Sequence, residues 1–363
     1  MINNDMNIFM KEYQILIVEE IFHLLFKKKI NELNYKVGDW EINDFSCVFS
    51  LSLLNEEKNK FHIKIPRVNI TFSAIDLIKS DDVEMAKNEY KSLQFLQENW
   101  PDKYSIKFIE PIVYIEKYNA IVSKTFIGTD FFLNVRKYDI RNKFFNTQIP
   151  TKIQNQLKNI SNTIFSYHKI SITNNQIRNT EIILLKVKIK KIISELMEQS
   201  VSQDCFKILL EYISTQDDNF KNITYASTLK GLDIRNILIN LDNEICMLDP
   251  GKLKIEPEVA GIARYLVTCE MIYWGTIYFF FHFKLSNKLL STIKSPYQNI
   301  GKSNRNLLKL YLIKEYCKHW KQAYHNIDLK KRWPNIFRAC MKYFYVDRFF
   351  NKEINKIIKN ESE

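Results

Sequence analysis

The sequence predicts an α+β fold with two lobes, a small lobe built on an antiparallel sheet and a larger lobe that is mainly helical. Three observations lead to this prediction. Short runs of β-branched and alternating residues, typical of strands, fill 37–68 and 106–124. From residue 151 onward, apolar residues recur mostly at helical spacing. Glycine and proline are scarce, with 7 and 8 residues in a chain of 363, which favours helices.

We expect three regions along the chain. They are a helical extension at 1–36, a small lobe at 37–128 and a helical large lobe at 129–363 that carries a hairpin at 229–252. Hydrophobic residues make up 46% of the chain and charged residues 26%, which argues against disorder. The chain is therefore long enough and apolar enough for two lobes with cores of their own.

The net charge is +12, but lysine and arginine are scattered rather than clustered. A basic surface favours ATP, other anionic compounds or a membrane surface as partners. No aromatic-plus-basic motif of recognisable spacing indicates a nucleic acid, so none is expected. The six cysteines are widely spread and form no C-x-x-C pair, which predicts reduced thiols, a cytoplasmic location and no zinc.

Neither apolar stretch of the chain predicts a signal peptide or a membrane span. The run at 15–26 contains two glutamates, and its lysines follow the apolar part instead of preceding it. The stretch at 262–283 contains Glu270, and a carboxylate in mid-segment is costly in lipid. We expect a buried helix there and no transmembrane segment.

A first helix is expected at 8–30 and a first hairpin at 47–54 and 61–65. In its second strand Phe61, Ile63 and Ile65 point to one face and Lys64 to the other. No glycine-rich phosphate loop precedes this hairpin. Phosphate contacts here would therefore come from backbone N–H groups or from Ser46.

The next helix, at 81–100, carries Glu89 in the same stripe as Leu93 and Leu96. A carboxylate among core positions is costly unless it is paired. Lys64, which points off the preceding hairpin, is its natural partner. The alternative is a partly exposed glutamate at the edge of the stripe and a solvated lysine. Strands near 106–114 and 120–124 and then a series of helices follow; we expect the helices at 151–168, 180–198, 204–215, 305–326 and 330–358.

The stretch 223–252 contains two apolar strands, 237–240 and 245–248, joined by an Asp-Asn turn. Asn236 precedes the first strand and Asp249 follows the second, so an antiparallel hairpin places both at its open end. An amide oxygen beside a carboxylate suits Mg²⁺, which keeps waters and phosphates as further ligands. The alternative is that both residues only cap strand ends.

This stretch resembles the catalytic hairpin of the kinase-like superfamily of aminoglycoside phosphotransferases, choline kinases and saccharide kinases. Asn236-Ile-Leu-Ile is similar to their N-I-L-V, and Asp249-Pro-Gly to a shortened D-F-G. Lys64 and Glu89 arrive in the order of the kinase ion pair. The resemblance implies that ATP and Mg²⁺ are cofactors, that Lys64, held by Glu89, binds the phosphates and that Asn236 and Asp249 bind the metal. It also implies an adenine-binding hinge near 122–126 and a hydroxyl of a small molecule or saccharide as acceptor.

The chain departs from the family pattern at two positions. The H-R-D-x-x-x-x-N pattern places the catalytic base five residues before the asparagine, where Gly231 stands. Gly261 stands where the family has an aspartate in E-V-A-G-I-A-R-Y-L. Either Asp233 serves as the base from a shorter loop, or the base is missing. The alternatives to a phosphotransferase are thus a pseudokinase and a basic protein that docks peripherally to a membrane or a polyanion.

Overall fold

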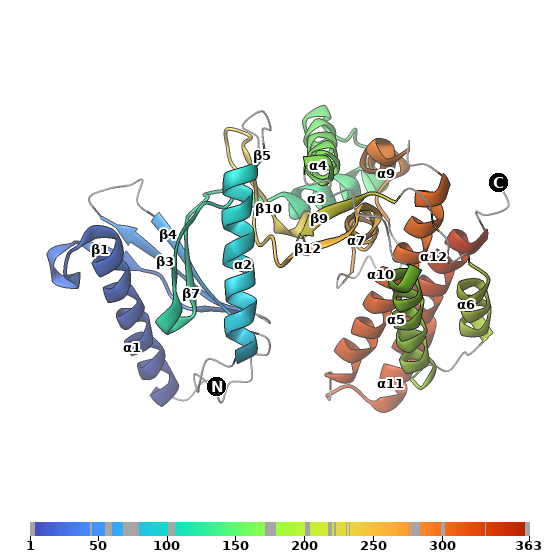
Figure 1. Ribbon diagram of the computed structural model, residues 1–363, viewed down its shortest axis with the longest axis horizontal. Helices are drawn as coiled ribbons and strands as arrows, with labels where there is room; N and C mark the ends of the chain where they lie inside the picture. Colours follow the sequence, from blue (N-terminus) through green and yellow to red (C-terminus); the bar gives the residue numbers. More distant parts are fainter. Residues whose placement is uncertain are drawn as a thin grey trace. The chain divides into compact units, whose positions relative to one another are not determined.

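The computed structural model divides the chain into two compact units, which are described separately (Figure 1). Unit 1 comprises 1–131, 229–231 and 236–253, and unit 2 comprises 132–228, 232–235 and 254–363. The structure describes residues 4–43, 46–54, 60–67, 80–100, 106–170, 179–199, 204–216, 220, 223–229, 231, 233–274, 276, 284–298, 302–330 and 332–359.

Unit 1 contains an antiparallel sheet with the strand order β1-β3-β4-β7-β6, and β2 adds to β3. The strands are β1 (Tyr35–Val37), β2 (Glu41–Asn43), β3 (Ser46–Leu53), β4 (Lys60–Pro66), β6 (Pro111–Ile115) and β7 (Ala120–Lys124). The two faces of the sheet pack against different helices. Phe61, Ile63 and Ile65 of β4 share a buried cluster with α1 (Asn4–Ile21), whereas Ile121 of β7 packs with α2 (Ser80–Asn99). The alternation in β4 therefore turns Lys64 toward the α2 side.

A second sheet of unit 1 has the order β5-β11-β10-β8, in which β5 (Ile106–Phe108) runs parallel to β11 (Ile245–Met247). β10 (Ile237–Ile239) and β11 form the predicted hairpin, with Ile237 opposite Met247. β8 (Thr129–Asp130) pairs with β10. The sequence grouped this hairpin with the helical lobe. The contacts group it with unit 1, because β5 and β8, which border it, both belong to that unit.

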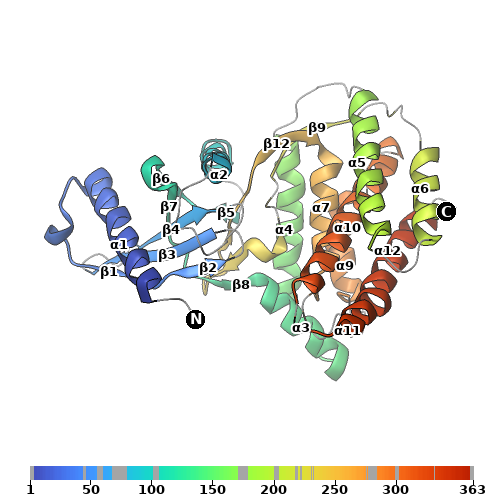
Figure 2. The same ribbon diagram turned by 90° about the horizontal axis from the view of Figure 1, so that it is seen from below.

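Unit 2 is mainly helical, and Figure 2 shows its helices from a second direction. Its long helices are α3 (Phe131–Phe145), α4 (Thr151–Ile170), α5 (Asn179–Met197), α6 (Asp204–Thr215), α7 (Glu258–Glu270), α9 (Asn287–Lys294), α10 (Lys302–Asp328) and α12 (Arg348–Lys359). α7 is buried on nearly all sides, and the indole of Trp320 on α10 stacks on Phe350 with ring centroids 5.5 Å apart. β9 (Tyr225–Leu229) and β12 (Leu253–Pro257) form a two-stranded sheet.

The α+β class and the two-part division into a sheet lobe and a helical lobe are confirmed. Several local expectations differ from the structure. The strand near 106–114 is two strands, β5 and β6; α1 passes at Phe22 into a π-helix, η1 (Phe22–Phe26); and the β9–β12 pairing was not anticipated. The predicted helix at 330–358 begins only at Asn335, because Pro334 disfavours helical geometry in the residue before it. Among the described residues, no helix is both long and apolar enough to cross a membrane.

Candidate active site

The centre of the candidate site is the ammonium group of Lys64 on β4. Its Nζ lies 2.8 Å from Oε1 of Glu89 on α2 and 3.1 Å from Oδ2 of Asp249, which follows β11. The first contact is the ion pair that the sequence predicts. The second contact links the small-lobe lysine to the Asp-Pro-Gly element. We call these three side chains the Lys64 cluster.

The Lys64 cluster is buried on one side and open on the other. The side chains of Lys64 and Glu89 are 15% and 6% exposed, whereas that of Asp249 is 47% exposed. Burial raises the pKa of Glu89 to about 7, although the Lys64 ammonium opposes this shift. Burial alone would lower the pKa of Lys64, but the two carboxylates outweigh it and the net pKa shift is upward. Lys64 therefore stays charged and presents a cation beside the exposed carboxylate.

Asp249 adopts a backbone conformation that is uncommon for a residue with a side chain. Its φ is 40°, and Gly251 two residues later has a φ of 64°. Such left-handed residues are costly and concentrate at functional sites. The N–H of Leu248 donates to the carbonyl of Asn236 over 2.7 Å. This bond extends the hairpin ladder by one residue and brings Asn236 and Asp249 to the same open end, as the sequence predicts.

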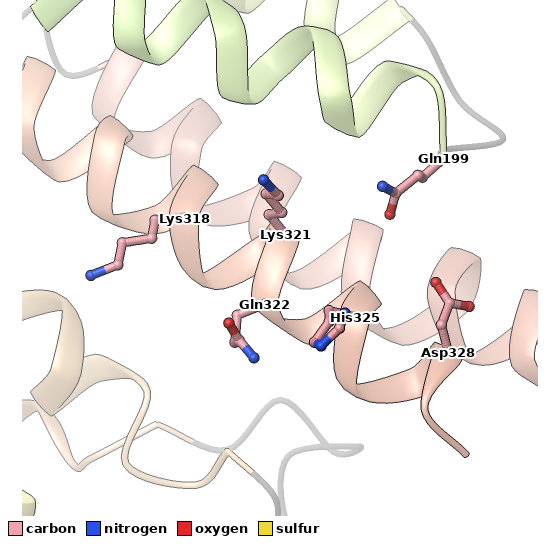
Figure 3. A pocket seen from close by; sticks show the side chains of 6 residues that line it. All are labelled: Gln199, Lys318, Lys321, Gln322, His325 and Asp328. Atoms are coloured by element: carbon pink, nitrogen blue, oxygen red, sulfur yellow. The ribbon is translucent and has the colours of Figure 1, made fainter. Parts of the chain in front are cut away.

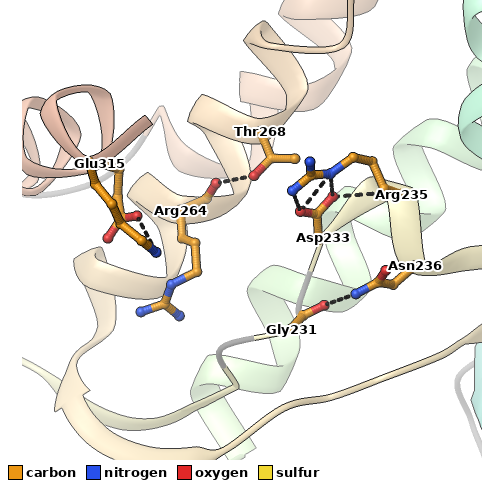
Figure 4. Close-up of polar contacts among 8 residues, drawn as sticks. Gly231, Asp233, Arg235, Asn236, Arg264, Thr268 and Glu315 are labelled. Atoms are coloured by element: carbon orange, nitrogen blue, oxygen red, sulfur yellow. Dashed lines mark hydrogen bonds and ion pairs between the residues drawn. The ribbon is translucent and has the colours of Figure 1, made fainter. Parts of the chain in front are cut away.

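Gly231, at the position where the resemblance places the base, is packed against the Asp-Pro-Gly backbone. Its N–H donates to the carbonyl of Pro250 over 2.9 Å, and its carbonyl accepts from Nδ2 of Asn236 over 3.1 Å. Figure 4 shows the second bond. A Cβ at residue 231 would lie 1.9 Å from the carbonyl oxygen of Asp249. A carboxylate side chain therefore cannot occupy this position without moving the backbone that carries Asp249.

Asp233 belongs to unit 2, where its carboxylate faces the guanidinium of Arg235 (Figure 4). Nε of Arg235 lies 3.0 Å from both carboxylate oxygens, and Nη2 also donates to Oδ2. The backbone N–H of Arg235 donates to Oδ1 over 2.8 Å. Asp233 thus caps the turn before β10, which is the alternative role that its position allows. The sequence reasoning overlooked Arg235, although an arginine two residues after an aspartate is a readable signal.

The resemblance also extends to Arg264 on α7. Its Nη2 lies 2.7 Å from Oε1 of Glu256, and its carbonyl accepts from the hydroxyl of Thr268 (Figure 4). Burial would raise the pKa of Glu256, but Arg264 and the hydroxyl of Thr228 hold this pKa at about 2. This ion pair fixes α7 to the end of β12. Its position inside unit 2 indicates a structural role.

Ser46 lies on the same face of the sheet as Lys64. In the β3–β4 register Ser46 stands opposite Pro66 and Val48 opposite Lys64, so their side chains share one face. Ser46 is 8% exposed. The two residues before it, at the place of a phosphate loop, lie outside the described residues. In segment 122–126, where the resemblance implies a hinge, the hydroxyl oxygen of Thr125 is buried and has no hydrogen-bond partner within the described chain.

The donor set at the open end of the hairpin suits a metal that takes most of its ligands from water or from a bound molecule. It comprises the amide of Asn236 and the carboxylate of Asp249. Magnesium commonly binds one or two carboxylates together with water and phosphate oxygens. Within the described residues, no group of three or more His, Cys, Asp or Glu side chains forms a metal site. The pair therefore fits Mg²⁺ only in company with a phosphate-bearing ligand.

Two further contacts fix the segment after Asp249 to α2, and the sequence showed neither of them. The backbone N–H of Leu253 donates to the hydroxyl of Ser92 over 2.9 Å. Nζ of Lys252 lies 3.2 Å from Oε1 of Glu84. They hold the segment at two points on the helix that carries Glu89.

A separate pocket lies on unit 2 (Figure 3). It is lined by Gln199, Lys318, Lys321, Gln322, His325 and Asp328. Lys321 pairs with Glu195 over 2.6 Å and Asp328 with Lys342 over 2.8 Å. These charges compensate one another locally, and none of the lining residues was singled out from the sequence.

Solved structures share this architecture over nearly their whole length. The choline kinase LicA from Streptococcus pneumoniae superposes with a TM-score of 0.50 at 10% identity, covering 95% of this chain and 98% of its own. The fold is kinase-like. The ternary complex of APH(2'')-IIa with streptomycin and ATP gives a TM-score of 0.51 at 12% identity, covering 92% of this chain and 97% of its own. The ADP-bound aminoglycoside phosphotransferase APH(2'')-Ib gives a TM-score of 0.50 at 11% identity, covering 92% of this chain and 98% of its own.

Comparisons of the sequence itself give no relative. No protein-family model matches the chain. No curated protein matches it either. The kinase-like assignment therefore rests on the architecture, and the identities of the site residues have to carry any argument about chemistry.

Proposed function

We propose that the chain is an ATP-dependent phosphotransferase that acts on a hydroxyl group of a small molecule or saccharide. The observation that carries the proposal is the Lys64 cluster. In this cluster a buried lysine is paired with a helix glutamate and lies beside the aspartate of the Asp-Pro-Gly element. Protein kinases need this constellation for phosphoryl transfer. Catalysis of this kind depends mainly on positioning and on neutralising phosphate charge.

Each member of the site has a defined task in this proposal. Lys64, held by Glu89, would bind the nucleotide phosphates. Asn236 and Asp249 would hold Mg²⁺, which when bound neutralises charge on the phosphates and fixes their orientation. Ser46 would add a hydroxyl on the Lys64 face of the sheet. The hinge at 122–126 would bind adenine, and the buried hydroxyl of Thr125 has hydrogen-bonding capacity left for a ligand.

Asp233 would orient the acceptor hydroxyl and accept its proton. For this its carboxylate has to exchange part of its contact with Arg235 for the substrate. The side chain of Arg235 is 53% exposed, so it can move away without opening a core. Choline kinase and aminoglycoside phosphotransferase, with which the fold is shared, carry small-molecule acceptors in their names. This supports an acceptor of similar size.

A pseudokinase is the second candidate, and a specific observation favours it. The base position holds Gly231, and the Asp249 backbone fills the space that a side chain would need. Asp233 meanwhile accepts hydrogen bonds from Arg235 at both of its oxygens. In this second proposal the chain binds a nucleotide through the Lys64 cluster and transfers nothing.

Thermal unfolding with and without ATP and Mg²⁺ tests the nucleotide proposal. A ligand at about 100 times its dissociation constant stabilises the folded state by about 2.7 kcal/mol, so a clear rise in Tm is expected. Asp249→Asn should remove most of the rise. The matched control is Asp242→Asn, which makes the same change at an exposed position in the turn of the same hairpin. The proposal fails if no nucleotide raises the Tm at roughly millimolar concentration.

A transfer assay separates the two candidates. Labelled ATP is incubated with the chain and a panel of amino alcohols, aminoglycosides and saccharides. Transfer to one acceptor class establishes the phosphotransferase. Nucleotide binding without transfer to any acceptor supports the pseudokinase.

A further inference from the structure

The C-terminal helices of unit 2 expose a row of apolar side chains. α11 (Asn335–Cys340), η6 (Met341–Asp347) and α12 follow one another without a break. In their first half Ile336 is 79% exposed, Phe337 48% and Phe344 56%. Single exposed apolar side chains are ordinary, but a contiguous row of large ones marks an interaction surface.

Cations continue this row along the second half. Phe344, Arg348 and Lys352 follow at intervals of four residues, so they lie on one side of the helix. Both basic residues are exposed. We call the whole surface the aromatic–basic face; it consists of Trp333, Ile336, Phe337, Tyr343, Phe344, Arg348 and Lys352.

The charge that this face presents is positive, because its acidic residues point inward. Residues 329–359 contain nine lysines and arginines and only two acids, Asp347 and Glu353. Asp347 is 3% exposed and accepts from the indole N–H of Trp320 over 2.9 Å. Glu353 is 4% exposed and lies 3.2 Å from Nζ of Lys356, with Lys284 as a second partner. Both carboxylates are thus buried, whereas Arg348 and Lys352 are exposed.

The aromatic rings of the face pair with each other at the surface. Trp333 and Phe337 are in T-shaped contact with ring centroids 5.1 Å apart, and Tyr343 and Phe344 are 4.9 Å apart. Tryptophan and tyrosine combine an apolar ring with one polar group. They are therefore the residues that settle at the boundary between lipid and water.

We propose that the aromatic–basic face binds the surface of an anionic lipid bilayer. Ile336, Phe337 and Phe344 enter the boundary between headgroups and acyl chains, while Arg348 and Lys352 contact lipid phosphates. Binding that combines an apolar insertion with a basic patch is stronger than either alone. This proposal is independent of the proposed phosphotransferase activity.

Another exposed apolar row, on α5, lacks the aromatic residues that favour the boundary between lipid and water. Ile183, Leu184 and Val187 are 48%, 54% and 56% exposed, so they match the face in exposure. However, α5 contains no aromatic residue. The α5 row therefore provides a matched control on the same unit.

Vesicle flotation of the full chain tests the proposal. One vesicle population contains phosphatidylglycerol and phosphatidylcholine in equal parts, and the other contains phosphatidylcholine alone. At about 0.1 M salt, where electrostatic contacts still reach about 10 Å, the chain should float with the anionic vesicles only. The triple variant Ile336→Ser, Phe337→Ser, Phe344→Ser should bind them at least about tenfold more weakly, because the buried apolar area is lost.

The control variant Ile183→Ser, Leu184→Ser, Val187→Ser should float like the unchanged chain. Arg348→Gln with Lys352→Gln should weaken binding and flatten its salt dependence. A second readout does not depend on the triple variants. The fluorescence emission of Trp333, measured as the difference between the unchanged chain and the Trp333→Phe variant, should shift to the blue when the chain binds vesicles. The proposal is overturned if the face variant and the α5 variant lose binding equally, or if the chain binds neutral vesicles as well as anionic ones. It is also overturned if the chain does not bind vesicles but binds heparin, and the face variant binds heparin equally well.

Discussion

The Lys64–Glu89 ion pair of unit 1 and the Asp233–Arg235 ion pair of unit 2 are built differently. Lys64 and Glu89 are 25 residues apart in the sequence and nearly buried. Asp233 and Arg235 are two residues apart, and the side chain of Arg235 is 53% exposed. A long-range buried pair forms only when the whole unit is folded, whereas a pair within one turn can form locally. The first pair is thus specified by the fold of unit 1, and the second pair is specified by a single loop.

Gly231 bears on the proposed role of Asp233. The Asp249 backbone approaches Gly231 so closely that no side chain fits at the usual position of the base. If the chain is the proposed phosphotransferase, the base would therefore come from another position in the loop that follows. The four variants below test this contrast, in order of decreasing effect.

Asp233→Asn should produce the largest change. If the chain transfers phosphate, turnover should fall about 10²–10⁴-fold, because a positioned general base is lost while size and hydrogen bonding are retained. Nucleotide binding, measured by the Tm shift, should persist because the Lys64 cluster is unchanged. Unaltered turnover in a steady-state assay would remove Asp233 from the mechanism.

Lys64→Met and Glu89→Gln should be strongly coupled in their effect on the free energy of unfolding. Removing the lysine at pH 8 leaves a buried carboxylate without its cation, which costs about 3 kcal/mol. Urea unfolding of both single variants and the double variant gives the coupling energy. Lys87 and Glu116 on the surface of the same unit are the control pair, and their cycle should show a much smaller coupling. Additive effects of Lys64→Met and Glu89→Gln would mean that the two side chains do not interact.

The raised pKa of Glu89 should make stability depend on pH. Below pH about 4.5 the carboxyl group of Glu89 is protonated in both the folded and the unfolded state. Between pH about 4.5 and about 7 only the folded state keeps the proton. The folded state binds more protons in this window, so the free energy of unfolding should fall as the pH rises, by at most about 3 kcal/mol. Denaturant unfolding at pH 5, 6 and 7 measures this slope, and Glu89→Gln should remove its contribution. A slope of the opposite sign that Glu89→Gln abolishes would show that the Lys64 ammonium outweighs burial.

Gly231→Ala should have the smallest effect. Its Cβ meets the Asp249 carbonyl, so the neighbouring backbone has to shift, at a cost of about 1–3 kcal/mol. Thermal unfolding should register this cost, and the Tm rise with ATP and Mg²⁺ should shrink because Asp249 is displaced. An unchanged Tm would mean that the loop relaxes easily, in which case Gly231→Asp becomes a way to restore the usual base.

The sequence by itself determined many of the elements and the pairing of Lys64 with Glu89. Alternation in 61–65 placed Lys64 on the other face of the strand from Ile63 and Ile65. The carboxylate in the apolar stripe of the following helix required a cation. The turn chemistry between 237 and 248 predicted the hairpin and its open end. These inferences succeeded because alternation, helical stripes and turn residues are local properties of the chain.

Only the tertiary structure decided which partners these residues have. The contact of Lys64 with Asp249, the placement of β5 beside β11 and the approach of the Asp249 carbonyl to Gly231 all join segments that are distant in the sequence. The same is true of Asp347 and Glu353 on the C-terminal helices, whose carboxylates the packing buries. Such contacts depend on how the elements pack, and packing is decided by the summed burial of many side chains rather than by any local pattern.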